Sequence, residues 1–185
     1  MSSLDKSLES KFNDLKLAIN EDRGRLPTSQ GVNALIMVYP PKEEKEYLKR
    51  VKADYGDQYI IDLSKLFVDY IEEFGMDVFL EMYKNYRSTS VFYDDSDQQK
   101  DFLDLILKEI KIAAEKDKMP VLIRTGILYG TGIRNNVILE SDVVAKMKKS
   151  LIVFYPGEVE KDIDGKERVY FLGTVKASDY RGQLL

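Results

Sequence analysis

The chain has 185 residues, of which 44% are hydrophobic and 32% charged, and its formal net charge is −4. This size and composition suit one globular domain with a substantial core and exclude a disordered or membrane-embedded chain. The sequence contains no cysteine and no histidine, so zinc, thiol-nucleophile and Ser-His-Asp chemistries are excluded within it. The acidic balance makes direct nucleic-acid binding the least favoured of the functions considered.

The apolar segments are short. The longest uninterrupted run is Ala34 to Tyr39, which is far too short to span a bilayer. The N-terminal residues also lack the apolar core of a signal peptide. We therefore expect a cytoplasmic protein that makes no membrane contact.

The first predicted element is an amphipathic helix over residues 3–20, because its apolar residues recur at helical spacing. These residues are Leu4, Leu8, Phe12, Leu15 and Ile19. The apolar face either packs on the domain's own sheet or docks on a partner, and we favour the first interpretation. A polar turn segment, residues 21–33, follows.

Apolar runs and helical patterns then alternate. The run from Ala34 to Tyr39 does not alternate with polar residues, which is typical of a strand buried on both faces. Further strands are predicted over residues 59–63, 121–123, 151–155 and 167–172. Further helices are predicted over residues 42–55, 65–74, 77–86 and 101–116, and after the glycine-rich turn that ends near residue 134. Residues 87–98 are interpreted as a surface loop.

The residues at the ends of the predicted elements lead to specific predictions. Ser64 is positioned to cap the helix over residues 65–74, and Pro156-Gly157 is expected to stop the strand before it. Asp164-Gly165 lies between Val159 and Val169 and indicates a hairpin, which would make the last strand antiparallel.

Together these elements predict an α/β fold: a mostly parallel central sheet of about five strands, with helices on both faces and the last strand antiparallel in a hairpin. We find no linker and no internal repeat. We therefore predict one domain over residues 1–185, with the sheet core over about residues 33–174 and a short C-terminal tail.

The glycine-rich turn is the first candidate for chemistry. It follows a strand and precedes a helix, where α/β folds hold anions, and its candidate anion-binding residues are Arg124, Gly130, Gly132 and Arg134. The spacing matches neither the dinucleotide fingerprint nor the P-loop. A turn that needs left-handed backbone conformations is the favoured explanation.

The two Tyr-Pro corners are the second candidate. If the strands ending at Tyr39-Pro40 and Tyr155-Pro156 are parallel neighbours, both corners lie along the same rim. The acidic residues that follow them can be explained as solvated loop residues. A metal site in this chain would need oxygen ligands alone, and we predict no metal and no cofactor.

At these same segments the chain resembles the BrxB family, a small component of bacteriophage-exclusion (BREX) defence systems. The resemblance covers roughly residues 32–182. It rests on Val38–Glu44, Leu122–Tyr129, Phe154–Gly157, Phe171–Gly173 and Tyr180-Arg181. The chain departs from the family in having Gly130-Thr131-Gly132 where a proline and an aromatic residue are usual, and residues 76–98 match no family segment.

The resemblance implies a role in antiviral defence. BREX systems use a methyltransferase, a large ATPase and an alkaline-phosphatase-like protein, PglZ. A BrxB-like chain would be a non-catalytic adaptor that binds the PglZ-like protein or the ATPase. The resemblance supplies no catalytic residues.

We therefore predict a protein-interaction module, without predicting its oligomeric state. Aromatic residues and arginine often anchor interfaces, and the expected surface is Tyr39, Pro40, Arg124, Gly126, Tyr129, Arg134, Tyr155, Pro156, Gly157 and Arg181. The alternative is a phosphate- or nucleotide-binding enzyme or sensor that uses the Arg-flanked glycine turn.

Overall fold

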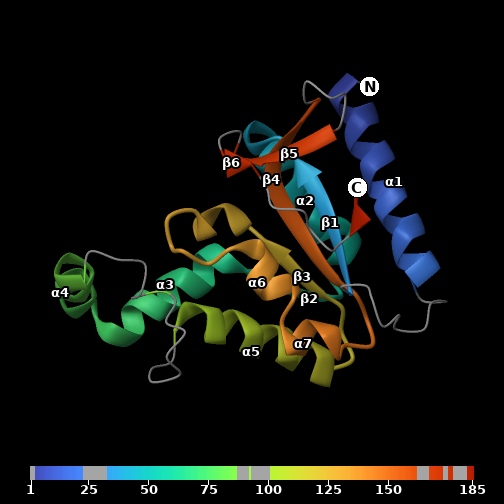
Figure 1. Ribbon diagram of the computed structural model, residues 1–185. Helices are drawn as coiled ribbons and strands as arrows, with labels where there is room; N and C mark the ends of the chain where they lie inside the picture. Colours follow the sequence, from blue (N-terminus) through green and yellow to red (C-terminus); the bar gives the residue numbers. More distant parts are fainter. Residues whose placement is uncertain are drawn as a thin grey trace.

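The computed structural model describes residues 3–22, 33–86, 92, 101–161, 167–172, 175–176 and 183–185. It is a mixed α/β fold in which a largely parallel sheet is covered by helices on both faces, as the alternation of segments predicts (Figure 1).

The helices are α1 (Ser3–Asp22), α2 (Glu44–Tyr55), α3 (Leu63–Phe74), α4 (Met76–Tyr86), α5 (Phe102–Glu115), α6 (Asn135–Leu139) and α7 (Asp142–Ala145). Two 3₁₀ turns are η1 (Pro41–Glu43) and η3 (Thr125–Leu128). The strands are β1 (Ala34–Tyr39), β2 (Tyr59–Asp62), β3 (Pro120–Ile123), β4 (Leu151–Lys161), β5 (Glu167–Phe171), β6 (Val175–Lys176) and β7 (Gln183–Leu184).

The parallel part of the sheet has the order β2-β3-β4-β1-β7. The second half of β4 continues beyond it and pairs with β5 in antiparallel fashion, with Val159 opposite Val169. This register confirms the predicted antiparallel last strand, while Asp164-Gly165 itself lies outside the described residues. The length of β4 overturns the expectation that Pro156-Gly157 would stop it.

Both faces of the sheet are packed, and β1 shows how. Leu35, Met37 and Tyr39 belong to one core cluster, whereas Ile36 and Val38 belong to the other, as the two-residue period of a strand requires. Helices α1 and α2 cover the first face, and α3 and α5 to α7 cover the second. The continuous apolar run therefore does form a strand buried on both sides.

Helix α1 packs on the domain's own sheet. Phe12 and Leu15 are completely buried, and the Phe12 ring lies 5.8 Å from the Phe154 ring, measured between centroids. Each such side chain contributes about 1.5–3 kcal/mol through removal of apolar surface from water. The favoured interpretation of the N-terminal helix is thus confirmed.

Two predicted boundaries shift for identifiable reasons. Ser64 is not the cap of α3; Asp62 is, because its carboxylate accepts a hydrogen bond from the Ser64 backbone N–H at 3.1 Å. The C-terminal tail was expected to lie outside the sheet, but part of it forms a strand. Residues Gln183 and Leu184 form β7 beside β1, so the sheet extends past residue 174.

Candidate functional site

The two Tyr-Pro corners meet at one rim of the sheet. Strands β1 and β4 are parallel neighbours, and Tyr39 lies opposite Pro156 in the register. However, the exposed fraction is 0% for Tyr39 and 2% for Tyr155, and Pro156 and Gly157 are buried as well. The prediction that these four residues form an exposed interaction surface is wrong, because neighbouring elements cover them.

Aromatic packing explains why the tyrosines face inward. The Tyr39 ring stacks on Tyr47 of α2 with 5.0 Å between centroids, and its hydroxyl donates to Glu44 Oε1 at 2.8 Å. Burial, reinforced by this hydrogen bond, raises the pKa of Tyr39 well above its usual range. On the opposite face of the sheet, the Tyr155 ring lies 4.8 Å from the Phe171 ring of β5.

The close approach of β5 to β4 explains why residue 157 is a glycine. A Cβ atom at this position would lie 2.8 Å from the Tyr170 carbonyl oxygen and 3.3 Å from the Tyr155 ring. Gly126 differs, because a Cβ there would meet Pro156 Cγ at an ordinary 3.5 Å. The glycine of the second corner is therefore required by the close approach of two strands.

Arg124 is engaged within the domain. Its backbone has a left-handed conformation with φ of 57°, and its Nη1 lies 3.1 Å from Asp62 Oδ2. Asp62 thereby bonds an arginine and caps α3 at the same time. The groove beside them, about 520 Å³ in volume, is lined by three basic side chains and three carboxylates, so its charges balance.

The glycine turn is closed by its own polar groups. Gly130 and Gly132 have φ of 84° and 82°, which glycine adopts without strain. Between them the Thr131 hydroxyl donates to the Leu128 carbonyl at 2.8 Å and accepts from the Ile133 N–H at 3.2 Å. These contacts support the interpretation as a structural turn. The helix that follows, α6, is only five residues long.

The other members of the predicted surface remain at least partly accessible. Tyr129, Gly130, Gly132 and Arg134 are exposed, and Pro40, Arg124 and Gly126 are half-buried. Among the described residues, no ion pair or hydrogen bond joins Arg124 and Arg134 to one acceptor. Arg181 lies outside the described residues.

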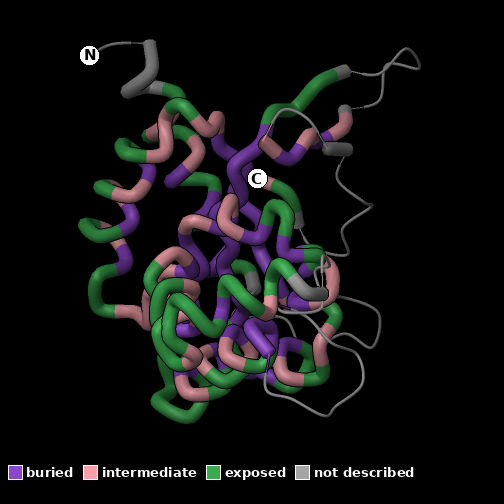
Figure 2. The backbone as a smooth tube through the Cα atoms, turned by 90° about the vertical axis from the view of Figure 1, so that its left-hand side faces the viewer, coloured by how far each residue is buried: buried purple, intermediate pink, exposed green. Residues whose placement is uncertain are grey.

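A different region offers an exposed apolar face. Met76, Leu80 and Tyr83 of α4 are 58%, 41% and 48% exposed. Their i, i+4, i+7 spacing aligns them along one side of the helix, and we call these three residues the α4 ridge. Helix α4 lies beyond the end of α3, away from the sheet (Figure 1). Figure 2 faces this end of the molecule, and the nearest coils are largely exposed, with buried strands behind them.

Helix α4 is anchored by a neighbouring strip of its surface. Phe79 is buried, and its ring lies 5.6 Å from that of Phe92. Gly75, with φ of 79°, forms the elbow between α3 and α4, and its carbonyl accepts a hydrogen bond from the Phe79 N–H. The Tyr83 ring borders this anchor, with its centroid 6.1 Å from that of Phe92, but the anchor holds only part of the helix circumference and the three ridge side chains remain exposed.

The sequence analysis predicts this helix but not its exposed apolar face. A sequence signal does exist, since apolar residues occupy more of the circumference of α4 than one packed face requires. They are Met76, Val78, Phe79, Leu80, Met82 and Tyr83. Of these, only Phe79 is fully buried.

Within the described parts of the chain, no helix is both long enough and apolar enough to cross a membrane. The same residues contain no cluster of three or more acidic side chains arranged to hold a metal ion. Comparison of the chain with protein-family models, with curated proteins and with solved structures gave no match in any of the three.

Proposed function

We propose that this chain is a non-catalytic adaptor that binds a partner protein through the α4 ridge. The observation that carries the proposal is the exposure of Met76, Leu80 and Tyr83 on a helix that extends away from the sheet. Burying apolar surface is worth about 25 cal/mol per Å², and methionine and tyrosine are enriched in interfaces. A ridge that protrudes fits a protein partner better than a small ligand, which binds in concave sites.

The proposed setting is a BREX-type anti-phage complex, with a PglZ-like protein as the first candidate partner and the system's ATPase as the second. The support is the resemblance to the BrxB family. Its most distinctive residues, Tyr39 and Tyr155-Pro156-Gly157, are buried where β1, β4 and β5 meet. The resemblance therefore concerns residues that specify the fold, and it suggests a shared scaffold rather than a shared binding surface.

The proposal is tested by measuring the affinity between the chain and a purified PglZ-like protein of a BREX system. A Leu80→Ala/Tyr83→Ala variant should bind at least about tenfold more weakly, as expected for loss of about 1.4 kcal/mol. Leu17→Ala is the matched control, because Leu17 is 61% exposed on α1 at the opposite end. Equal affinity of the ridge variant and the control, with both proteins folded, would reject the ridge as the docking site.

The alternative, a phosphate- or nucleotide-binding protein, is tested on the same samples. A saturable rise in melting temperature with ATP and Mg²⁺, lost in an Arg134→Ala variant, would favour it over the adaptor. The Asp62 partner of Arg124 accounts for that arginine without a ligand, so we expect no such rise.

A further inference from the structure

The charges around the α4 ridge restrict the kind of partner that can cover it. Helices α3 and α4 carry five carboxylates and two lysines, which gives a net charge of −3 between Leu63 and Tyr86. All seven side chains are exposed. The carboxylates belong to Asp69, Glu72, Glu73, Asp77 and Glu81.

Among the residues that the structure describes, these carboxylates have no cationic partner. Elsewhere in the structure acidic residues do find cations: Asp54 pairs with Lys16 and Arg50, and Asp117 pairs with Lys149. The acidic residues of α3 and α4 are exposed, and no described cation occupies them.

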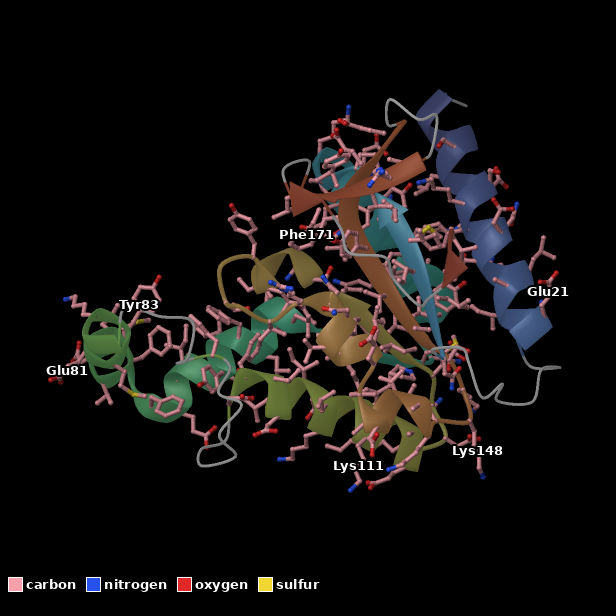
Figure 3. The ribbon with its side chains drawn as sticks, viewed as in Figure 1. Glu21, Glu81, Tyr83, Lys111, Lys148 and Phe171 are labelled. Carbon is pink, nitrogen blue, oxygen red and sulfur yellow. The ribbon has the colours of Figure 1, made fainter. Side chains whose placement is uncertain are left out.

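The acidic and apolar side chains share one end of the molecule. Figure 3 shows Glu81 and Tyr83 both extending from α4, at the end farthest from the labelled Glu21 of α1. Asp77 and Glu81 each come one residue after a ridge residue, Met76 and Leu80. They therefore lie beside the ridge on the helix circumference, and both are exposed. A partner that covers the ridge thus meets carboxylates along its border.

From this juxtaposition we infer that the ridge receives a basic amphipathic segment of the partner protein, with apolar side chains on the ridge and Lys or Arg side chains beside the carboxylates. This inference rests on the proposed adaptor function and specifies the chemistry of its partner. Charge complementarity of this kind speeds association and selects partners, and apolar anchors at i, i+3, i+4 and i+7 spacing are a common recognition mode.

The same charges disfavour two other occupants. A second copy docking ridge to ridge would bring two acidic borders together, which costs affinity. A membrane surface rich in anionic lipid would repel the carboxylates, because such surfaces attract Lys and Arg. Both occupants are outcomes of the test below.

The test uses the full chain and two fluorescein-labelled 18-residue amphipathic peptides. One has Leu on its apolar face and Lys on its polar face, and the other has Glu in place of every Lys. We expect the Lys peptide to bind at least tenfold more tightly than the Glu peptide. Its affinity should fall at least tenfold in Leu80→Ala/Tyr83→Ala and at least tenfold in Asp77→Lys/Glu81→Lys. It should also weaken as NaCl rises.

The charge control is Glu9→Lys/Asp14→Lys. It makes the same change in net charge on the exposed side of α1, far from α4 (Figure 1), and should leave the peptide affinity within about twofold of wild type. An equal loss in this control and in Asp77→Lys/Glu81→Lys would overturn the inference, because binding would then follow overall charge. Equal affinity for the Lys and Glu peptides would overturn it as well.

Two further outcomes also overturn the inference. One is a concentration-dependent dimer, seen by analytical ultracentrifugation, that Leu80→Ala/Tyr83→Ala abolishes. The other is ridge-dependent binding to phosphatidylserine vesicles. Failure here is distinguishable from failure of the adaptor proposal: if the ridge variant loses the PglZ-like partner while the peptide preference is absent, the docking site stands and only the partner chemistry is wrong.

Discussion

The rim of the sheet, where the Tyr39-Pro40 and Tyr155-Pro156 corners meet, and the α4 ridge differ in how distinctive their sequences are and in how exposed their side chains are. The rim carries the most distinctive residues in the sequence, yet Tyr39, Tyr155 and Gly157 are buried by the fold's own elements. The ridge belongs to a helix whose sequence contains no recognised motif, yet its large apolar side chains are exposed. A distinctive motif can therefore serve the fold, and the binding surface that we propose lies in a segment without any motif.

This difference makes stability and binding separable. Substitutions at the rim should change the free energy of unfolding, whereas substitutions on the ridge should change partner affinity. The predictions below test this separation, each with a matched position where the chain offers one.

The largest expected effect is that of Tyr155→Ala. Tyr155 is buried against Phe171, so truncation should lower the free energy of unfolding by about 3–5 kcal/mol. The same change at Tyr83, which is half-exposed on the ridge, should cost no more than about 1 kcal/mol. Urea unfolding followed by circular dichroism measures both. Similar losses at the two positions would remove the distinction between rim and ridge.

A second contrast is expected between two rim glycines. Gly157→Ala should destabilise by about 1–3 kcal/mol, because its new Cβ would lie 2.8 Å from the Tyr170 carbonyl oxygen. Gly126→Ala has ordinary contacts at 3.5 Å and should change stability by less than about 1 kcal/mol. Thermal unfolding distinguishes the two. A stable Gly157→Ala protein would mean that β4 and β5 can separate at little cost.

The third prediction concerns pH. Burial, followed by the Glu44 hydrogen bond, raises the pKa of Tyr39, whereas an unfolded tyrosine ionises near about pH 10. Tyr39 therefore stabilises the fold fully below about pH 10, and this contribution declines as pH rises further, by up to about 1.4 kcal/mol per pH unit. Tyr39→Phe should cost about 1 kcal/mol at pH 7.

The gap between Tyr39→Phe and wild type should narrow between about pH 10 and 11, because phenylalanine has no proton to lose. Urea titrations at pH 7, 9, 10 and 11 measure this gap. A gap that stays constant across the series would show that the Tyr39 hydroxyl ionises as it does in the unfolded chain.

Much of the fold was predictable because its signals are local. The apolar run at Ala34–Tyr39 identifies a strand buried on both faces, and the spacing of Phe12 and Leu15 identifies the buried face of α1. The antiparallel direction of β5 followed from a turn signal between Val159 and Val169. Each of these depends on a few neighbouring residues, so one sequence suffices.

The site was less predictable because exposure depends on distant elements. Tyr39 is buried since Tyr47 of α2 stacks on it, and Tyr155 is buried since β5 returns across β4. Conversely, nothing in residues 76–86 says which apolar side chains another element will cover. Phe79 is covered by packing near Phe92, while Leu80 is not.

The smallest expected effect concerns the backbone strain at Arg124, measured as the difference in stability between its Gly and Ala variants. Its left-handed φ of 57° is strained for any residue with a Cβ, so Arg124→Gly should be more stable than Arg124→Ala by up to about 1 kcal/mol. Arg134, with φ of −90°, should show the reverse order, because there glycine only adds freedom to the unfolded chain. Paired melting curves for the four variants measure these differences. If Arg124→Ala were at least as stable as Arg124→Gly, the strain at Arg124 would be negligible, and its role would rest on the Asp62 pair alone.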